Sequence, residues 1–553
     1  MKRYKRFQWI GTILVLSLLV GYFIYTHWVE VTPFYAVKYD PEIQYFSNSL
    51  ALFKGASYAY IDHPGTPLEV VGSFLLATTR PITRARGELF IPFHLANPHF
   101  FTTMAHALVA ILSLATVGLL IHRSWEIDGW ASLIASLGLG VTYFAAYAPL
   151  TFRTLDWWTH NAFNLPFGTL LLLGVVLRLR RSEPLGNLEL VSFGILAGLL
   201  LCVQLYFIAW AIGILTSIIL FEILSERSIL AAVRSSVLSV SGLLLGFFIG
   251  FAPVMHRFRS FYLWVRRLIF HQGRYGQGPE GITTTGQFLD NLRWLWNRGE
   301  LVFFLSLVAL ILLLIAMVRR RSQQDRAPGW WAVSIGVLLQ FVTLWILIGK
   351  HPGINYLISV AALLPVVFLL ALQPIVDRDG VRKLILLTFG GILIVMFLVG
   401  LIVAVQDNHA WSKQVQTADE EIDRAIADYA SDNGLSRDDL VILWGYGVPS
   451  RCYALRYGNG STENRALRAE IDELCPNEWN YDVWGGFVEL PWVYEPLSDN
   501  CDWDMLILPE RYLPELDSAR AKVYQLSAQT RGYGKITIVE MIQGACPSAA
   551  AEN

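Results

Sequence analysis

Long apolar stretches alternate with short basic turns along most of the chain. About eleven stretches are apolar over the roughly 20 residues that a helix needs to cross a bilayer, and they begin near residues 7, 99, 130, 161, 188, 207, 236, 300, 330, 355 and 383. After residue 406 the pattern changes to short apolar runs between charged, helix-like segments. The pattern predicts a polytopic α-helical membrane domain over residues 1–406 and a soluble α/β domain over residues 407–553.

The basic residues predict how these helices are oriented. The first stretch follows MKRYKR, and no small-residue cleavage site comes after it, so we expect a membrane anchor rather than a cleaved signal peptide. Short basic turns lie near residues 122, 178, 225, 318 and 377, at alternate ends of the stretches. Because basic turns stay in the cytoplasm, we expect a multi-pass plasma (inner) membrane protein with a cytoplasmic N-terminus and an extracytoplasmic C-terminal domain.

Composition supports a membrane protein and excludes one class of partner. The 553 residues are 54% hydrophobic and only 16% charged, with a net charge of -1. A nucleic-acid binder would carry a basic excess on an exposed domain, so we expect membrane lipids as partners and no nucleic acid.

The cysteines fit the predicted orientation. One cysteine lies within an apolar stretch and four lie in the C-terminal domain: Cys202, and then Cys452, Cys475, Cys501 and Cys546. An even number of cysteines in an oxidising compartment predicts two disulfides, with three possible pairings. Four unrelated buried thiols are the alternative.

Ionisable residues avoid the middle of the apolar stretches, where only His106 lies deep. Ion-coupled transporters and channels usually keep ionisable groups inside the membrane, so this pattern argues against them. The ionisable residues gather instead in three predicted extracytoplasmic segments, and these are Asp40, Glu42, Asp62 and His63; Arg153, Asp156 and His160; and Lys350 and His351. Such a set suits a reaction in which a carboxylate takes a hydroxyl proton and a cation holds a departing phosphate.

The first of these segments also contains two short amphipathic runs. IQYFSNSLALF and TPLEVVGSFLLATT have apolar residues at helical spacing but are too short to cross the bilayer. We expect two helices that lie in the membrane interface, close to the acids of the loop.

The arrangement resembles the GT-C glycosyltransferases, in particular the branch of protein O-mannosyltransferases and the lipid A aminoarabinose transferase. Four motifs carry the resemblance: YDPE at 39–42, the acid-base-Pro turn DHPG at 62–65, LDWW at 155–158 and KHPGINY at 350–356. The resemblance implies a GT-C-like fold and an inverting enzyme. Such an enzyme moves a sugar from a polyprenyl-phosphate donor to an extracytoplasmic glycan, lipid or protein.

The resemblance also implies a role for each motif residue. Asp40 matches the catalytic base, while Glu42, Asp62 and Asp156 would orient the substrate or a metal. The phosphate of the donor would be held by His63, Lys350 and His351. The sequence demands no cofactor; a divalent cation, Mg or Mn, would have Asp62 and Asp156 as ligands. The second Pro of the family's turn is replaced by Gly65.

The loop at 254–299 mixes arginine with aromatic residues. Such a segment beside a membrane can hold anionic groups, so Arg266, Arg267 and Arg274 are further candidates for the donor phosphate, on a segment that could also act as a lid. A passive interfacial helix is the alternative.

In the C-terminal domain, LVILWGY, DMLILPE and KITIVEMI have the composition of strands, and AWSKQVQTADEEIDRAIADYA that of a helix. The aromatic residues Trp479, Tyr481, Trp484 and Trp492 could bind an acceptor or could belong to the core.

Simpler explanations exist for each motif, and two other functions fit the sequence. Asp-Pro and His-Pro-Gly are ordinary turn formers, Asp156 could cap a helix, and Lys350 with His351 could extend to the interface. A lipid-linked glycan ligase or carrier would bind a lipid diphosphate without releasing a polyprenyl monophosphate. A non-catalytic membrane scaffold would present the C-terminal domain and would tolerate the loss of Asp40.

Overall fold

The chain divides into two compact units, which we number 1 and 2. Unit 1 contains residues 1–25, 61–68 and 105–405, and unit 2 contains residues 26–60, 69–104 and 406–553. The computed structural model describes residues 2–29, 33–37, 42–59, 66–124, 130–146, 152, 157–225, 228–272, 276, 278–281, 283–322, 327–375, 379–483, 487–489, 494–497, 502–514, 521–530 and 534–542. Most of the first predicted extracytoplasmic loop thus groups with the C-terminal region in unit 2. The expected domain boundary at residue 406 falls within one long helix, α20 (Asp379–Asn433), whose residues belong to unit 1 up to 405 and to unit 2 from 406 onward.

Unit 1 is a helix bundle. Among the described residues of the chain, nine helices are long and apolar enough to cross a membrane. Their bounds are α1 (Lys2–Ile24), α7 (Pro98–Ser124), α11 (His160–Phe163) continued through η4 (Asn164–Gly168) into α12 (Thr169–Leu179), α14 (Phe207–Leu224), α15 (Ile229–Phe251), α17 (Thr285–Ser322), α18 (Pro328–Lys350), α19 (Leu357–Ile375) and α20 (Asp379–Asn433). The prediction of a polytopic helical membrane protein is confirmed.

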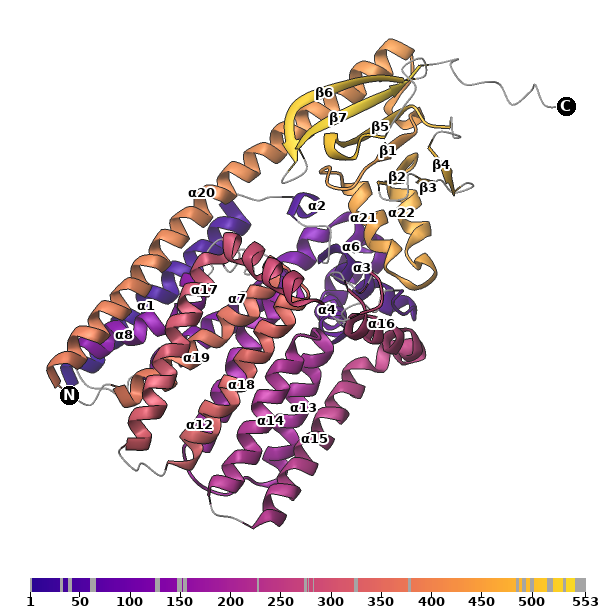
Figure 1. Cartoon of the computed structure of the whole chain (residues 1–553). Coiled ribbons are helices and arrows are strands. Elements are labelled where there is room, and N and C mark those ends of the chain that lie inside the picture. Colours follow the sequence, from indigo (N-terminus) through magenta and orange to yellow (C-terminus); the bar gives the residue numbers. More distant parts are fainter. Residues whose placement is uncertain are drawn as a thin grey trace. The chain divides into compact units, whose positions relative to one another are not determined.

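Two of the eleven predicted spans are shorter than the others. The stretch near residue 130 forms α8 (Trp130–Gly140) and α9 (Thr142–Ala146), with a turn at Val141 between them. The stretch near residue 188 forms α13 (Asn187–Val203), which has 17 residues. In Figure 1, α12, α13, α14, α15 and α18 run side by side.

Helices α13 and α15 pack backbone against backbone. Gly194 and Gly198 on α13, like Gly242 and Gly246 on α15, are spaced by four residues and lie on the facing sides of the two helices. A Cβ at Gly198 would overlap the carbonyl oxygen of Leu243. This is the small-xxx-small pattern that lets membrane helices approach closely.

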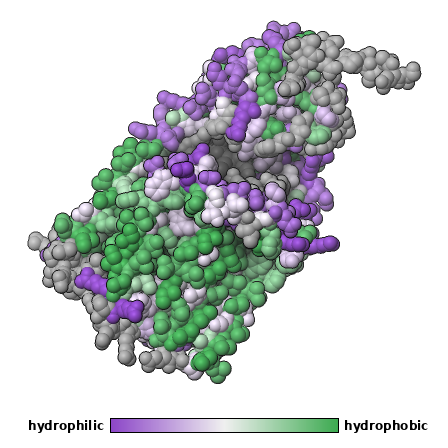
Figure 2. Space-filling view, in the orientation of Figure 1, coloured by the Kyte–Doolittle hydropathy of each residue, from purple (hydrophilic) through white to green (hydrophobic). Residues whose placement is uncertain are grey.

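The outward side of the bundle is apolar. On α15, nine large apolar side chains are exposed along the helix, among them Leu244, Leu245, Phe248 and Ile249. Figure 2 shows hydrophobic residues gathered over the face on which Figure 1 draws the helices of the bundle. Such a surface suits lipid rather than water.

Unit 2 contains a mixed sheet. The described strands number seven, in the order β4-β3-β2-β1-β5-β7-β6; β1 pairs in parallel with β2 and β5, and the other pairs are antiparallel. Their bounds are β1 (Ile442–Trp444), β2 (Glu478–Asp482), β3 (Phe487–Glu489), β4 (Tyr494–Pro496), β5 (Met505–Pro509), β6 (Ala521–Thr530) and β7 (Gly534–Met541). The three predicted strands are confirmed as β1, β5 and β7, and β5 is buried along its whole length.

Helices α21 (Arg451–Gly460) and α22 (Arg468–Leu474) lie between β1 and β2 in the chain, and a disulfide joins Cys452 to Cys475. One of the two predicted disulfides is thereby confirmed and its pairing assigned. Cys501 and Cys546 lie outside the described residues. Cys202 is buried and lies outside the disulfide, as expected from its place in an apolar stretch.

The rest of unit 2 is built from short helices of the first loop. They are α2 (Phe34–Val37), α3 (Gln44–Ala51), α4 (Thr66–Thr78), α5 (Arg80–Arg86) and α6 (Phe90–Ala96), and the residues of α4 from 69 onward belong to unit 2. The two helices expected in this loop are present as α3 and α4. In α3, all residues from Tyr45 to Ala51 are buried, so protein encloses this helix on every side.

Candidate functional site

The structure describes half of the ten predicted site residues. Five of them lie outside the described residues, namely Asp40, Asp62, His63, Asp156 and Arg274. The other five are placed, and these are Glu42, Arg266, Arg267, Lys350 and His351. Glu42 is buried at the start of α3 in unit 2, whereas the four basic residues belong to unit 1.

Lys350 joins the end of α18 to the end of α16 (Phe258–Phe270). Its Nζ donates hydrogen bonds to the carbonyl oxygens of Leu268, at 2.7 Å, and of Ile269. The last carbonyls of a helix have no partner within the helix, so a lysine there both satisfies them and complements the helix dipole. Lys350 is therefore brought close to the segment that carries Arg266 and Arg267, whose side chains are exposed.

The chain after α16 folds back onto the end of that helix. His271 and Glu280 form an isolated β-bridge, and the amide of Gly281 donates to the carbonyl of Phe270 at 2.7 Å. Gly276 has a φ of +68°, and a Cβ there would lie 2.7 Å from the carbonyl oxygen of Arg267. A glycine at position 276 is thus needed for the close approach of this segment to Arg267 at the end of α16.

Two tyrosines connect further helix ends to this region. The hydroxyl of Tyr206, in the break between α13 and α14, donates to the carbonyl oxygen of His351 at 3.0 Å. The ring of Tyr206 stacks on that of Tyr356, at the start of α19, with 4.1 Å between centroids. Sequence analysis identified His351 as a candidate but not Tyr206, because tyrosines between two apolar stretches are common at membrane interfaces and do not indicate a site.

A buried amide pair lies beside Tyr206. Gln204 ends α13 with extended backbone, and its Nε2 donates to Oδ1 of Asn161 at 3.4 Å; both side chains are buried. Asn161 belongs to α11, which begins four residues after Asp156 in the sequence. The polarity of this pair inside an apolar bundle is the signal that could have identified it.

The start of α4 is anchored to the ends of two helices of the bundle. Thr66 is the first described residue after the DHPG turn, and its hydroxyl donates to the carbonyl oxygen of Gly250, near the end of α15. The same hydroxyl lies 3.3 Å from Sγ of Cys202, at the end of α13.

We call the residues Gln204, Tyr206, Lys350, His351 and Tyr356, with Arg266 and Arg267, the polar end of unit 1. Its side chains are an ammonium, two guanidinium groups, an imidazole, two phenols and an amide. Most of these groups donate hydrogen bonds, so the arrangement favours an anion over a cation.

The described residues contain no group of three or more His, Cys, Asp or Glu side chains that could hold a metal ion. The two metal-ligand candidates, Asp62 and Asp156, lie outside the described residues, and the polar end offers cations rather than carboxylates.

The fold defines a multi-pass helical membrane protein with an α/β region. No family model and no curated protein matches the chain. It is similar to ArnT from Cupriavidus metallidurans bound to undecaprenyl phosphate, with a TM-score of 0.48, 12% identity and coverage of 96% of this chain and 98% of that chain. It is also similar to the Archaeoglobus fulgidus oligosaccharyltransferase in complex with Zn and sulfate, with a TM-score of 0.43, 11% identity and coverage of 90% of this chain and 68% of that chain.

Proposed function

We propose that the chain is an inverting GT-C glycosyltransferase that moves one sugar from a polyprenyl phosphate to an extracytoplasmic glycan, lipid or protein. The observation that carries this proposal is the polar end of unit 1. There, hydrogen-bond donors and cations gather where several helices of the bundle end. A lipid phosphate needs donors for its head and apolar surface for its tail, and this end of the bundle supplies both.

The donor phosphate is assigned to the basic residues. An ammonium has three N–H groups, and the hydrogen bonds of Lys350 to Leu268 and Ile269 use two of them, so the third can reach a phosphate oxygen. By holding the end of α16, Lys350 also fixes the helix that carries Arg266 and Arg267. Guanidinium groups bind phosphate in pairs of parallel hydrogen bonds. His63, His351 and Arg274 complete this assignment.

The acids are assigned to the acceptor. The acceptor oxygen forms a bond to the anomeric carbon while its proton passes to Asp40, and the electron pair of the breaking carbon–oxygen bond leaves with the phosphate. A single displacement inverts the anomeric carbon. Glu42, Asp62 and Asp156 orient the acceptor, and a divalent ion, if bound, would use Asp62 and Asp156.

The proposal places the N-terminus in the cytoplasm and assigns residues 1–406 to the catalytic domain and residues 407–553 to the extracytoplasmic domain. Because the first loop groups with the C-terminal region in unit 2, we assign the latter a role in holding that loop.

The test uses the full chain in detergent, a panel of radiolabelled polyprenyl-phosphate sugars and membrane extract as the acceptor source. We expect one donor to support transfer, and Asp40→Asn to lower the rate by about 100-fold or more while donor binding persists. The matched control is Glu420→Gln, which neutralises an exposed acid on α20. Equal rates in Asp40→Asn and wild type would remove Asp40 as the base. Binding of a lipid diphosphate without release of a monophosphate would favour a ligase or carrier, and no donor binding would favour a scaffold.

A further inference from the structure

A carboxyl group is buried in unit 2 in the middle of an apolar segment. Glu69 is the one ionisable residue of α4, TPLEVVGSFLLAT, and is 2% exposed. Burial raises the pKa of Glu69 well above its usual range. A carboxyl group in such a place is unfavourable unless its hydrogen bonds compensate, so its contacts indicate what it does there.

The contacts of Glu69 hold α4 against α3. Nδ2 of Asn48 donates to Oε1 of Glu69 at 2.6 Å, and the hydroxyl of Ser49, whose hydrogen is shared with the carbonyl of Tyr45, lies 3.1 Å from the backbone carbonyl oxygen of Glu69. One turn further along α4, the hydroxyl of Ser73 donates to the carbonyl of Ser49 at 2.6 Å. Gly72 permits this approach, because a Cβ there would overlap the hydroxyl of Ser49.

The same asparagine connects α3 to the C-terminal part of unit 2. The hydroxyl of Ser461, directly after α21, lies 3.4 Å from Oδ1 of Asn48 and shares its hydrogen between that oxygen and the carbonyl of Gly458. The amide of Ala59 donates to the carbonyl of Ser461 at 2.8 Å. Asn48 therefore donates to Glu69 and accepts from Ser461, and these three residues form a hydrogen-bonded chain that we call the Glu69 relay.

The two helices joined by Glu69 begin directly after the two acidic motifs. α3 begins at Gln44, after the YDPE motif at 39–42, and α4 begins at Thr66, after the DHPG turn at 62–65. Apolar packing alone would hold two short helices together, but it fixes their relative rotation less well than a directional hydrogen bond. A leucine in place of Glu69 would also avoid the unfavourable burial of a carboxyl group. Oε2 of Glu69 has no hydrogen-bond partner among the described residues. A contribution to stability alone therefore does not explain why a carboxyl group occupies this buried position.

We propose that Glu69 is a positioning residue, which acts through Asn48 to set the register of the two helices that follow the catalytic motifs. This inference rests on the proposed glycosyltransferase function. Glu69 is buried, and it acts by fixing the two helices that directly follow the motif acids in the sequence. A misplacement of about 1 Å at a reacting group can lower a rate by about 100-fold, so a small rotation of α3 or α4 is sufficient to matter.

The chemistry of the relay makes the test specific. Burial favours the protonated carboxyl group, so Gln, which keeps a carbonyl oxygen for Asn48 and carries no charge, should substitute for Glu69. Leu fills a similar volume without accepting a hydrogen bond. We expect Glu69→Gln to retain kcat within about threefold, and Glu69→Leu to lower kcat by about tenfold or more with the KM for the donor unchanged.

A matched control removes a different buried hydrogen bond of unit 2. The hydroxyl of Thr79 lies 2.8 Å from Nε2 of His94, and both side chains are buried. Thr79→Val should lower thermal stability about as much as Glu69→Leu does but leave kcat within about twofold, because this bond joins the residue between α4 and α5 to α6 rather than to α3. In Asn48→Leu the loss of rate should match that of Glu69→Leu, and the double variant should be no slower than either single one.

Hydrogen exchange of the full chain gives a readout that does not depend on activity. Residues 44–51 should exchange faster in Glu69→Leu than in wild type, and at the wild-type rate in Glu69→Gln. Wild-type exchange over α3 in Glu69→Leu would overturn the positioning role, whatever the activity. The positioning role would also be overturned if wild type were active and Glu69→Leu were equally active. If wild type were inactive but showed the expected exchange pattern, the proposed glycosyltransferase function would be wrong, while the stabilisation of α3 by Glu69 would be supported.

Discussion

The two units achieve close packing by different means. In unit 1, α13 and α15 meet through glycines, with backbone against backbone, and the polar contacts described above lie at one end of the bundle. In unit 2, buried charged and polar side chains lie between the elements, as Arg456 and Glu69 show. The surroundings explain the difference. Apolar side chains gain little by leaving lipid, so membrane helices associate through close backbone contact, whereas water drives apolar burial in unit 2 and leaves room for directional pairs.

The largest effect is expected where the glycines of unit 1 meet. A Cβ at Gly246 would overlap the carbonyl oxygen of Ile195, which is backbone and cannot move aside. Gly246→Val should therefore separate α13 from α15 and leave little folded protein, with a loss of stability above about 3 kcal/mol. The measurement is the yield of monodisperse protein in detergent together with its thermal midpoint.

The control for this variant lies on another helix. A Cβ at Gly118, on α7, would have no atom within 4 Å, so Gly118→Val should give wild-type yield and midpoint. A Gly246→Val protein as stable as Gly118→Val would show that close backbone contact does not hold the bundle together.

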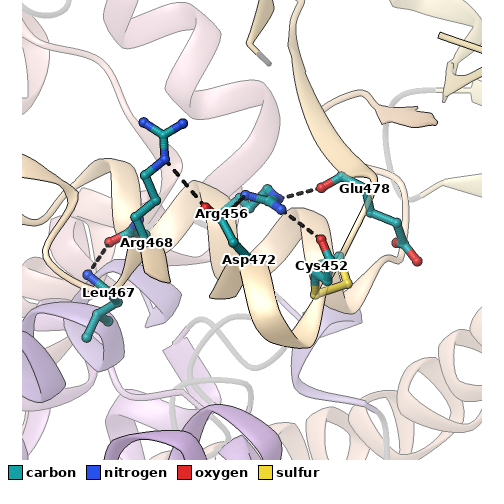
Figure 3. Close-up of polar contacts among 8 residues, drawn as sticks. Cys452, Arg456, Leu467, Arg468, Asp472 and Glu478 are labelled. Atoms are coloured by element: carbon teal, nitrogen blue, oxygen red, sulfur yellow. Dashed lines mark hydrogen bonds and ion pairs between the residues drawn. A yellow bond between two sulfur atoms is a disulfide. The ribbon is translucent and has the colours of Figure 1, made fainter. Parts of the chain in front are cut away.

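A smaller effect is expected at the buried arginine of unit 2, drawn in Figure 3. Arg456 donates to Oδ1 of Asp472 and to the carbonyl of Cys475 at 2.7 and 2.8 Å, and its guanidinium lies 3.7 Å from the centroid of the Trp479 ring. Met in this place leaves the carbonyls of Cys475 and Glu478 without their donor and removes the cation over the Trp479 ring, so Arg456→Met should lower the free energy of unfolding by about 2 kcal/mol. Denaturant unfolding of the oxidised full chain, followed by tryptophan fluorescence, measures this.

Arg468 provides the matched comparison because it approaches the same carboxylate from solvent. Its Nε lies 3.6 Å from Oδ2 of Asp472, and its side chain is 40% exposed. Arg468→Met should therefore change stability by less than about 1 kcal/mol. If both variants lost the same amount, burial would not distinguish the two arginines, and the contrast between the units would be weakened.

Regular patterns in the sequence were sufficient to predict most elements of the fold. Long apolar runs predicted the helices of unit 1, and β-branched runs predicted β1, β5 and β7. The strands β2, β3, β4 and β6 were missed, because β3 and β4 have only three residues each and β2 and β6 are largely polar, which leaves little apolar pattern. Cysteine number predicted disulfides, but only the fold could pair Cys452 with Cys475.

The candidate site was less accessible to sequence analysis, because its contacts join residues that are distant in the chain. Lys350 was singled out as a base, but its bond to Leu268 depends on the path of α16, 82 residues away. Lys54 pairs with Glu470 across 416 residues, which is why the association of the first loop with the C-terminal region could not be foreseen. Glu69 was overlooked because its importance depends on Asn48, on a different helix.

The smallest effect on stability is expected in α20, beyond the apolar part of this helix. The apolar part ends near Val405, and Asp419 lies further along in the polar part of the helix, within unit 2. The hydroxyl of Tyr35 donates to Oδ2 of Asp419 at 3.1 Å. Burial raises the pKa of Asp419 from 3.8 to about 6, with a further contribution from the charge of Asp423, although the hydrogen bond from Tyr35 opposes the shift.

The sign of the pH dependence follows from this raised pKa. Between pH 4 and pH 6 the folded state binds the Asp419 proton more tightly than the unfolded state does, so the stability contributed by this group is present below about pH 4 and is lost as pH rises through about 6. Asp419→Asn should therefore raise the thermal midpoint above pH 6, by an amount equivalent to about 1 kcal/mol once solvent screening is allowed for, and have little effect at pH 4. Asp432→Asn, which changes an exposed acid on the same helix, should give the wild-type pH profile. If the thermal midpoint of Asp419→Asn followed that of wild type from pH 4 to pH 7, Asp419 would be as well hydrated as an exposed acid. The burial of polar groups in unit 2 would then not include the part of α20 that belongs to this unit.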